Sequence, residues 1–145
     1  MKIKLPLIAC LLIILSACSI TKKTPHSAVD VRLNNIVWAV TSFRGKAINS
    51  SDFPNGVPTI VFNMQDSKLN GNDGCNSFMG LATYKGSTIT VGALASTKMA
   101  CPDNNIASSF YDILASKNLT WRLDGNEILR LFVNDAEVMA LKEKQ

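Results

Sequence analysis

The chain has 145 residues, of which 47% are hydrophobic, so it is long enough for one small domain with a single core. Its formal net charge is +4, but the basic residues are scattered along the sequence and do not cluster. A scattered distribution argues against nucleic-acid binding, which needs a basic patch or stripe.

The first feature in chain order is an N-terminal signal. Lys2 and Lys4 precede and flank the start of an apolar run that extends to Leu15, and small residues then lead to Cys18. The run is too short for a spanning helix, which needs roughly 20 apolar residues, and it fits the roughly 7–15 of a signal peptide. The sequence Leu-Ser-Ala-Cys at positions 15–18 is typical of a bacterial lipoprotein signal. We therefore predict that residues 1–17 are removed and that the Cys18 thiol is lipidated.

Lipidation at Cys18 predicts a protein of the cell envelope that is anchored to a membrane. Ser19 follows the cysteine where an aspartate would favour the inner membrane, so we expect the periplasmic face of the outer membrane in a Gram-negative bacterium. In a Gram-positive cell the same signal would place it on the outer face of the plasma membrane. Two or more acyl chains hold a protein stably on a bilayer, so no basic patch is required.

Residues 18–33 are predicted to form the lipidated N-terminus and a flexible tether. The segment from Ser19 to Asp30 is polar, contains one proline and lacks apolar periodicity. His26, the only histidine of the chain, lies here. A domain over residues 34–145 would therefore contain no histidine for catalysis or metal binding.

The first half of this domain is predicted to be rich in β-strands. Runs of β-branched and aromatic residues indicate strands at Ile36–Phe43 and Thr59–Asn63, and two shorter segments at Thr83–Tyr84 and Ser87–Val91. Between them, the sequence Gly-Asn-Asp-Gly at positions 71–74 indicates a tight turn or bulge with positive φ.

One helix and a β-meander are predicted for the second half. Asp103 can cap a helix that ends near Asn118, and its apolar face carries Ile106, Phe110, Ile113 and Leu114 at helical spacing. Turn dipeptides then separate three strands, at Leu119–Leu123, Ile128–Val133 and Glu137–Lys142. Many strands and one helix predict an α+β fold, a curved antiparallel sheet or partly closed barrel with the helix packed across it.

The four cysteines fall into two groups, two in the N-terminal signal region and two in the domain. Cys10 leaves with the signal and Cys18 is lipidated, so Cys75 and Cys101 remain in the domain. Outside the cytoplasm such a pair most often forms a disulfide, which would stabilise the fold by roughly 3–4 kcal/mol. Two alternatives remain open: both thiols are free or buried, or Cys101 has a lowered pKa beside the helix N-terminus and takes part in chemistry.

No set of residues with catalytic spacing is present in the sequence. The glycine-rich segment at 71–76 lacks the Lys-Ser/Thr pair of a phosphate-binding loop. Two cysteines are too few for a zinc site, which needs about four ligands. Several acidic residues, including Asp52, Asp66, Asp124 and Asp135, occupy predicted turns. We therefore expect no metal, no cofactor and no enzymatic activity.

Two motifs give the domain a family resemblance. Gly71-x-x-Gly74-Cys75-Asn76-x-x-x-Gly80 and Thr97-x-Met99-Ala100-Cys101 resemble the motifs of the META domain of HslJ-like lipoproteins. The resemblance implies an α+β domain without established enzymatic activity, in an envelope family linked to heat shock, novobiocin resistance, and secretion or virulence. It also implies structural roles for the motif residues. Gly74 and Gly80 would allow close backbone approach, Asn76 would hydrogen-bond the turn, and the two cysteines would form a bridge.

These observations predict a non-enzymatic envelope lipoprotein that supports stress or antibiotic tolerance by binding or stabilising envelope components. Its expected partners are the membrane, through the lipid anchor, and an envelope protein or small ligand, with the domain itself monomeric. Two other functions remain open: a thiol-dependent redox sensor or enzyme that uses Cys75 and Cys101, and a small-ligand carrier or inhibitor.

Overall fold

The computed structural model describes residues 32–53, 55–101, 106–125 and 127–145. The predicted signal, Cys18, His26 and the proposed helix cap Asp103 lie outside these ranges. Leu33 is fully buried in the core, so the folded domain includes this residue at the end of the predicted tether.

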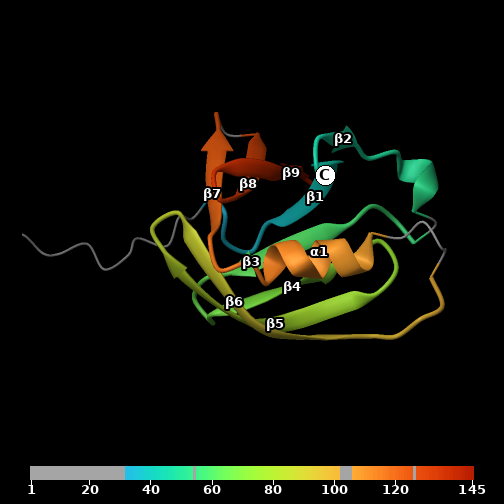
Figure 1. The fold of residues 1–145 in the computed structure, drawn as a ribbon, viewed down its shortest axis with the longest axis horizontal. Helices are drawn as coiled ribbons and strands as arrows, with labels where there is room; N and C mark the ends of the chain where they lie inside the picture. The colour runs from blue at the N-terminus through green and yellow to red at the C-terminus, as the bar shows by residue number, and fades with distance from the viewer. Residues whose placement is uncertain (1–31, 54, 102–105, 126) are drawn as a thin grey trace, which may run out of the picture.

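Nine antiparallel strands in the described residues form a ring that is not a true barrel, with one short helix (Figure 1). The sheet order is β2-β1-β3-β4-β5-β6-β7-β8-β9, and β1 also pairs with β9 to complete the ring. The strands are β1 (Val37–Phe43), β2 (Lys46–Ala47), β3 (Thr59–Asn63), β4 (Lys68–Asn72), β5 (Ser77–Lys85), β6 (Thr88–Ser96), β7 (Leu119–Asp124), β8 (Ile128–Val133) and β9 (Ala136–Glu143). A 3-10 turn (Ser50–Asp52) precedes β3.

The ring has its shortest strand pairing between β6 and β7, and at this point it departs from a regular barrel. Only Thr88 and Ile89 of β6 are in register with β7, opposite Thr120 and Leu119. The remainder of β6 lies beside the helix α1 (Ala107–Leu114), and the two elements line a common cavity. In Figure 1 the helix lies across the strands β3 to β6, between the two halves of the ring.

The helix joins the sheet because its apolar face enters the core. Phe110 is fully buried, and its ring lies 5.6 Å from that of Phe78 and 6.5 Å from that of Phe43, measured between centroids. Ile113 and Leu114 are buried on the same face. The predicted α+β class, with a curved antiparallel sheet and one helix packed across it, is confirmed. The helix ends at Leu114, however, and not near Asn118.

Side chains also fill the centre of the ring in the described part of the chain. Trp38, Ile60, Phe62, Leu69 and Leu131 are almost completely buried there. The described core is thus a packed interior, of the kind that gives a small domain its stability. Within the described ranges, no helix is long and apolar enough to cross a membrane.

The β4–β5 hairpin is the main difference from the sequence-based prediction. Gly71 and Asn72, predicted in a turn, are the last residues of β4, and the turn comprises the residues after them. The strand β4 was missed because its sequence, Lys-Leu-Asn-Gly-Asn, contains one apolar residue and no β-branched one. It is a strand because β3 and β5 pair with it on both sides.

Candidate functional site

The turn between β4 and β5 is organised by a buried carboxylate. Asp73 is 1% exposed, and its Oδ1 accepts hydrogen bonds from the backbone N–H groups of Cys75 (2.9 Å) and Asn76 (2.6 Å). Its Oδ2 accepts a hydrogen bond of 2.7 Å from the hydroxyl of Tyr111 on α1. A buried carboxylate is stable only with such partners, so Asp73 joins the turn to the helix.

Asn76 attaches the segment that follows β6 to the same turn. Its Oδ1 accepts hydrogen bonds from the backbone N–H of Met99 (2.7 Å) and from Oγ1 of Thr97 (3.0 Å). The Thr97 hydroxyl in turn accepts a hydrogen bond of 3.2 Å from the backbone N–H of Ser77. The motif residues Asn76, Thr97 and Met99 are therefore brought together, although Asn76 precedes the other two by more than 20 positions.

A disulfide joins Cys75 to Cys101, with a Cα–Cα distance of 5.9 Å. This is the bridge that the location of the two cysteines favours. Cys75 is buried, and the Nδ2 amide of Asn76 lies 3.0 Å from Sγ of Cys101. The disulfide therefore reinforces the attachment that Asn76 makes through hydrogen bonds.

Two motif glycines occupy positions that a larger residue would not fit. Gly74 has φ of +95°, and a Cβ there would lie 2.4 Å from a ring carbon of Phe53. At Gly71 a Cβ would lie 2.0 Å from the carbonyl oxygen of Thr59 on β3. Both distances are well inside van der Waals contact. Gly71 thus allows β4 to approach β3 closely, and Gly74 allows the turn to pack against Phe53.

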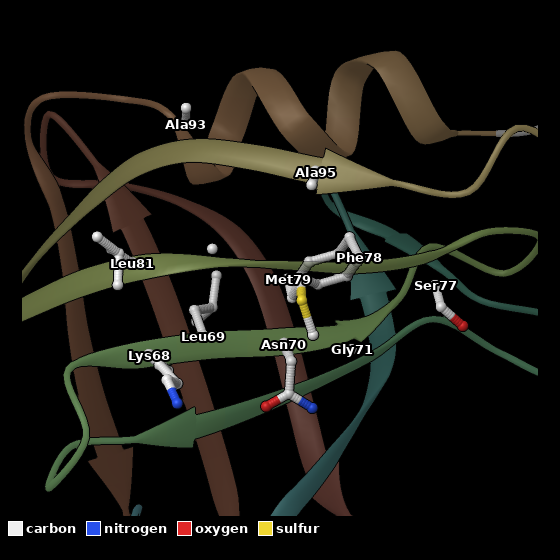
Figure 2. Close-up of a pocket in the computed structure, with 11 residues that line it drawn as sticks. Lys68, Leu69, Asn70, Gly71, Ser77, Phe78, Met79, Leu81, Ala93 and Ala95 are labelled. Carbon is white, nitrogen blue, oxygen red and sulfur yellow. The ribbon is translucent and has the colours of Figure 1, made fainter.

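An apolar groove lies next to this cluster, on the face of β4, β5 and β6 that points away from the core. We call it the outer groove; its volume is about 620 Å³ (Figure 2). Met79 and Leu81 of β5 are 65% and 68% exposed and project along it. The residues that line it are Lys68, Leu69, Asn70, Gly71, Ser77, Phe78, Met79, Gly80, Leu81, Ala93 and Ala95.

The strand alternation of β5 creates the outer groove. Phe78 and Ala82 are buried in the core, and the intervening Met79 and Leu81 face solvent. Opposite them, Ala93 and Ala95 of β6 are small, so the surface is hollow at this point. The motif glycines Gly71 and Gly80 are also part of the lining. At Gly80 a Cβ would lie 2.7 Å from the carbonyl oxygen of Ala93.

The outer groove carries a positive charge and no negative one. Lys68 is the one charged residue among its lining residues, all of which the structure describes. Asp66, which precedes it in the β3–β4 turn, accepts a hydrogen bond of 3.1 Å from the side chain of Asn63. The described residues contain no group of three or more acidic, cysteine or histidine side chains that could hold a metal ion.

Comparison with known proteins identifies the family. The model of the META domain matches residues 31–145. The chain belongs to the META domain family. No curated protein matches it.

Two solved structures share the fold of this META domain. One is an NMR structure of a protein from Burkholderia xenovorans, with 19% identity and a TM-score of 0.60, over 78% of this chain and 84% of that one. The other is also an NMR structure, with 21% identity and a TM-score of 0.62, over 77% of this chain and 92% of that one. These likenesses show a common fold and indicate no particular activity.

The disulfide of the META domain gives a first prediction. Because it closes a loop across 26 positions, its removal should lower the free energy of unfolding by about 3–4 kcal/mol. We propose to compare the mature chain with its Cys75→Ser/Cys101→Ser variant by urea denaturation, with Cys18→Ser in both. The denatured parent should show no free thiol. Two free thiols, or equal unfolding free energies, would contradict a structural disulfide and favour the thiol-chemistry alternative.

Tyr111 gives a second prediction. Burial and the hydrogen bond to Asp73 raise its pKa to about 12. The chain has two tyrosines, so in a Tyr84→Phe variant the absorbance change on tyrosinate formation reports Tyr111 alone. We expect a midpoint near 12 in the folded protein and about 10 in urea.

The unfolded chain releases the Tyr111 proton first, so the free energy of unfolding should fall as pH rises from about 10 to about 12. Adding Asp73→Asn should lower the folded midpoint part of the way towards 10, because burial of the phenol remains whereas the hydrogen bond to the carboxylate and its negative charge are lost. A midpoint near 10 in the folded Tyr84→Phe protein, with circular dichroism unchanged, would show that Asp73 does not hold Tyr111 in this way.

Proposed function

We propose that this META domain protein is a non-enzymatic, lipid-anchored protein of the cell envelope, which supports stress or antibiotic tolerance by binding an envelope component. The observation that carries the proposal is the outer groove, where two large apolar side chains, Met79 and Leu81, are mostly exposed. Contiguous exposed apolar surface on a small domain is a common mark of a binding site.

The location is supported by two independent features. The lipoprotein signal at residues 1–18 predicts export and lipidation at Cys18. A disulfide between Cys75 and Cys101 is consistent with an extracytoplasmic protein, because structural disulfides persist in oxidising compartments.

The chemistry of the described residues favours binding over catalysis. The outer groove has one ionisable side chain, that of Lys68. The buried carboxylate of Asp73 accepts three hydrogen bonds within the fold, which occupy both of its oxygens. A general base needs an oxygen or nitrogen within reach of a substrate proton, and Asp73 is committed to Tyr111 and the turn.

Lipidation is the first test. In a Gram-negative host that receives radiolabelled palmitate, the full-length chain should be labelled and should fractionate with the outer membrane. Cys18→Ala should abolish the label, whereas Cys10→Ala, the matched control, should retain it. A Ser19→Asp variant should move to the inner membrane. Equal labelling of the parent and Cys18→Ala would contradict the anchor.

Binding through the outer groove is tested in cells. In a strain that lacks the gene and shows reduced survival in heat or novobiocin, the wild-type gene should restore survival and the Met79→Ser/Leu81→Ser gene should not. Val37→Ser is the control, because Val37 is 41% exposed and is not part of the groove lining. Immunoblots must show equal amounts of all three proteins. Full restoration by the double variant would rule out the groove as the binding site.

A further inference from the structure

The pairing of its strands limits what the outer groove can bind. β4 is paired with β3 and β5, and β5 is paired with β4 and β6, so both strands at the centre of the groove have neighbours on each side. An extended peptide therefore cannot add to them as a further strand, which is the usual way in which a sheet binds a peptide through its backbone. On β4 and β5 the groove therefore offers side chains, which are apolar apart from Lys68, Asn70 and Ser77.

Lys68 lies at one end of the groove, Lys85 lies beyond that end on β5, and the exposed Asp66 precedes Lys68 in the β3–β4 turn. Lys68 is in register with Leu81, so the two residues are cross-strand neighbours at this end of the groove. Thr83 and Lys85 follow Leu81 on the same face of β5, because alternate residues of a strand share a face, and both are exposed. Apolar side chains with lysines at one end suit an anionic bilayer surface, where the apolar groups enter the headgroup region and the ammonium groups contact lipid phosphates.

The N-terminal segment joins the domain at the same end of the sheet. Asn34 forms a bridge with Phe62, and its Oδ1 accepts a hydrogen bond of 2.8 Å from the backbone N–H of Met64, just after β3. The neighbouring residue Asn63 is in register with Lys68. From Arg32 back to Cys18 the chain can span about 50 Å at most. An anchor at Cys18 would therefore hold the chain within about 50 Å of the bilayer at its point of entry, which is at the Lys68 end of the sheet.

We propose that the outer groove is the surface by which the anchored domain lies on its membrane, with Met79 and Leu81 inserted among anionic lipids and Lys68 and Lys85 against their phosphates. This inference rests on the proposed lipid anchor and adds the identity of the envelope component, which is the lipid surface itself. The groove contacts bilayer lipid in this arrangement and takes up no protein segment or second copy of the chain.

Vesicle partitioning tests the surface without the anchor. The probe is the mature sequence with Cys18→Ser, exported behind a signal peptide that lacks the lipoprotein cysteine, with vesicles of three parts phosphatidylethanolamine to one part phosphatidylglycerol. Met79→Ser/Leu81→Ser should lower the partition coefficient by about tenfold or more, since two apolar side chains no longer enter the bilayer. Lys68→Gln should lower it about fivefold, but should have no effect on phosphatidylcholine vesicles.

Two matched variants control for unspecific effects. Val37→Ser removes an exposed apolar side chain outside the groove lining, and Lys117→Gln removes one exposed charge beyond the helix. Both should partition as the parent does. Circular dichroism checks that every variant keeps the fold. Absence of vesicle binding by the parent, or equal partitioning of the parent and the double variant, would overturn the inference.

Photocrosslinking identifies the contact in the lipidated, full-length protein. Benzoylphenylalanine at position 79 or 81 should form adducts with phospholipid, and at position 122, an exposed site on β7, it should not. Adducts of position 79 or 81 chiefly with another protein, or with a second copy of the chain, would overturn the inference. Palmitate labelling is read separately, so a labelled protein whose groove forms no lipid adduct would refute the docking surface and leave the anchor in place.

Discussion

The buried carboxylate of Asp73 is the interaction on which the rest of this structure depends. A carboxylate that is 1% exposed would be strongly destabilising without partners, and Asp73 has three donors. Two belong to the β4–β5 turn, and the third is the hydroxyl of Tyr111 on the helix. This one side chain therefore fixes the turn and its distance from α1, and the turn holds the segment after β6 through Asn76 and the Cys75–Cys101 disulfide.

The sequence predicts those elements that depend on neighbouring residues and misses those that depend on contacts between distant ones. Local patterns predict five of the strands and the apolar face of the helix, because β-branched runs and helical spacing are properties of neighbouring residues. These strands are β1, β3, β7, β8 and β9. The hydrogen bonds by which Asp73 joins the turn to Tyr111 do not follow from such a pattern. Tyr111 follows Asp73 by 38 positions, so no local pattern links them. The strand β4 depends likewise on β3 and β5, because its own residues have low strand propensity.

The outer groove was missed in the sequence for a different reason. In β5 both sets of alternate residues are partly apolar: Phe78, Ala82 and Tyr84 on one face, Met79 and Leu81 on the other. A period of two shows that two faces exist and does not show which of them is buried. That choice is made by Leu69 of β4, in register with Gly80, and by Phe110 against Phe78. The strand segment predicted here covered only Thr83 and Tyr84, so Met79 and Leu81 were identified neither as strand residues nor as exposed ones.

An anchored domain needs little additional affinity to adopt one orientation on a membrane. The lipid chains would supply the binding free energy, and a tether of at most about 50 Å would hold the groove at high effective concentration near the bilayer. Under those conditions two apolar side chains and two lysines are enough to favour one face. The small area of the outer groove is thus consistent with a surface that orients the domain. The Cys75–Cys101 disulfide and the hydrogen bonds of Asp73 support this surface. They help to keep β4, β5 and β6 in the register that presents Met79, Leu81 and Lys68 together.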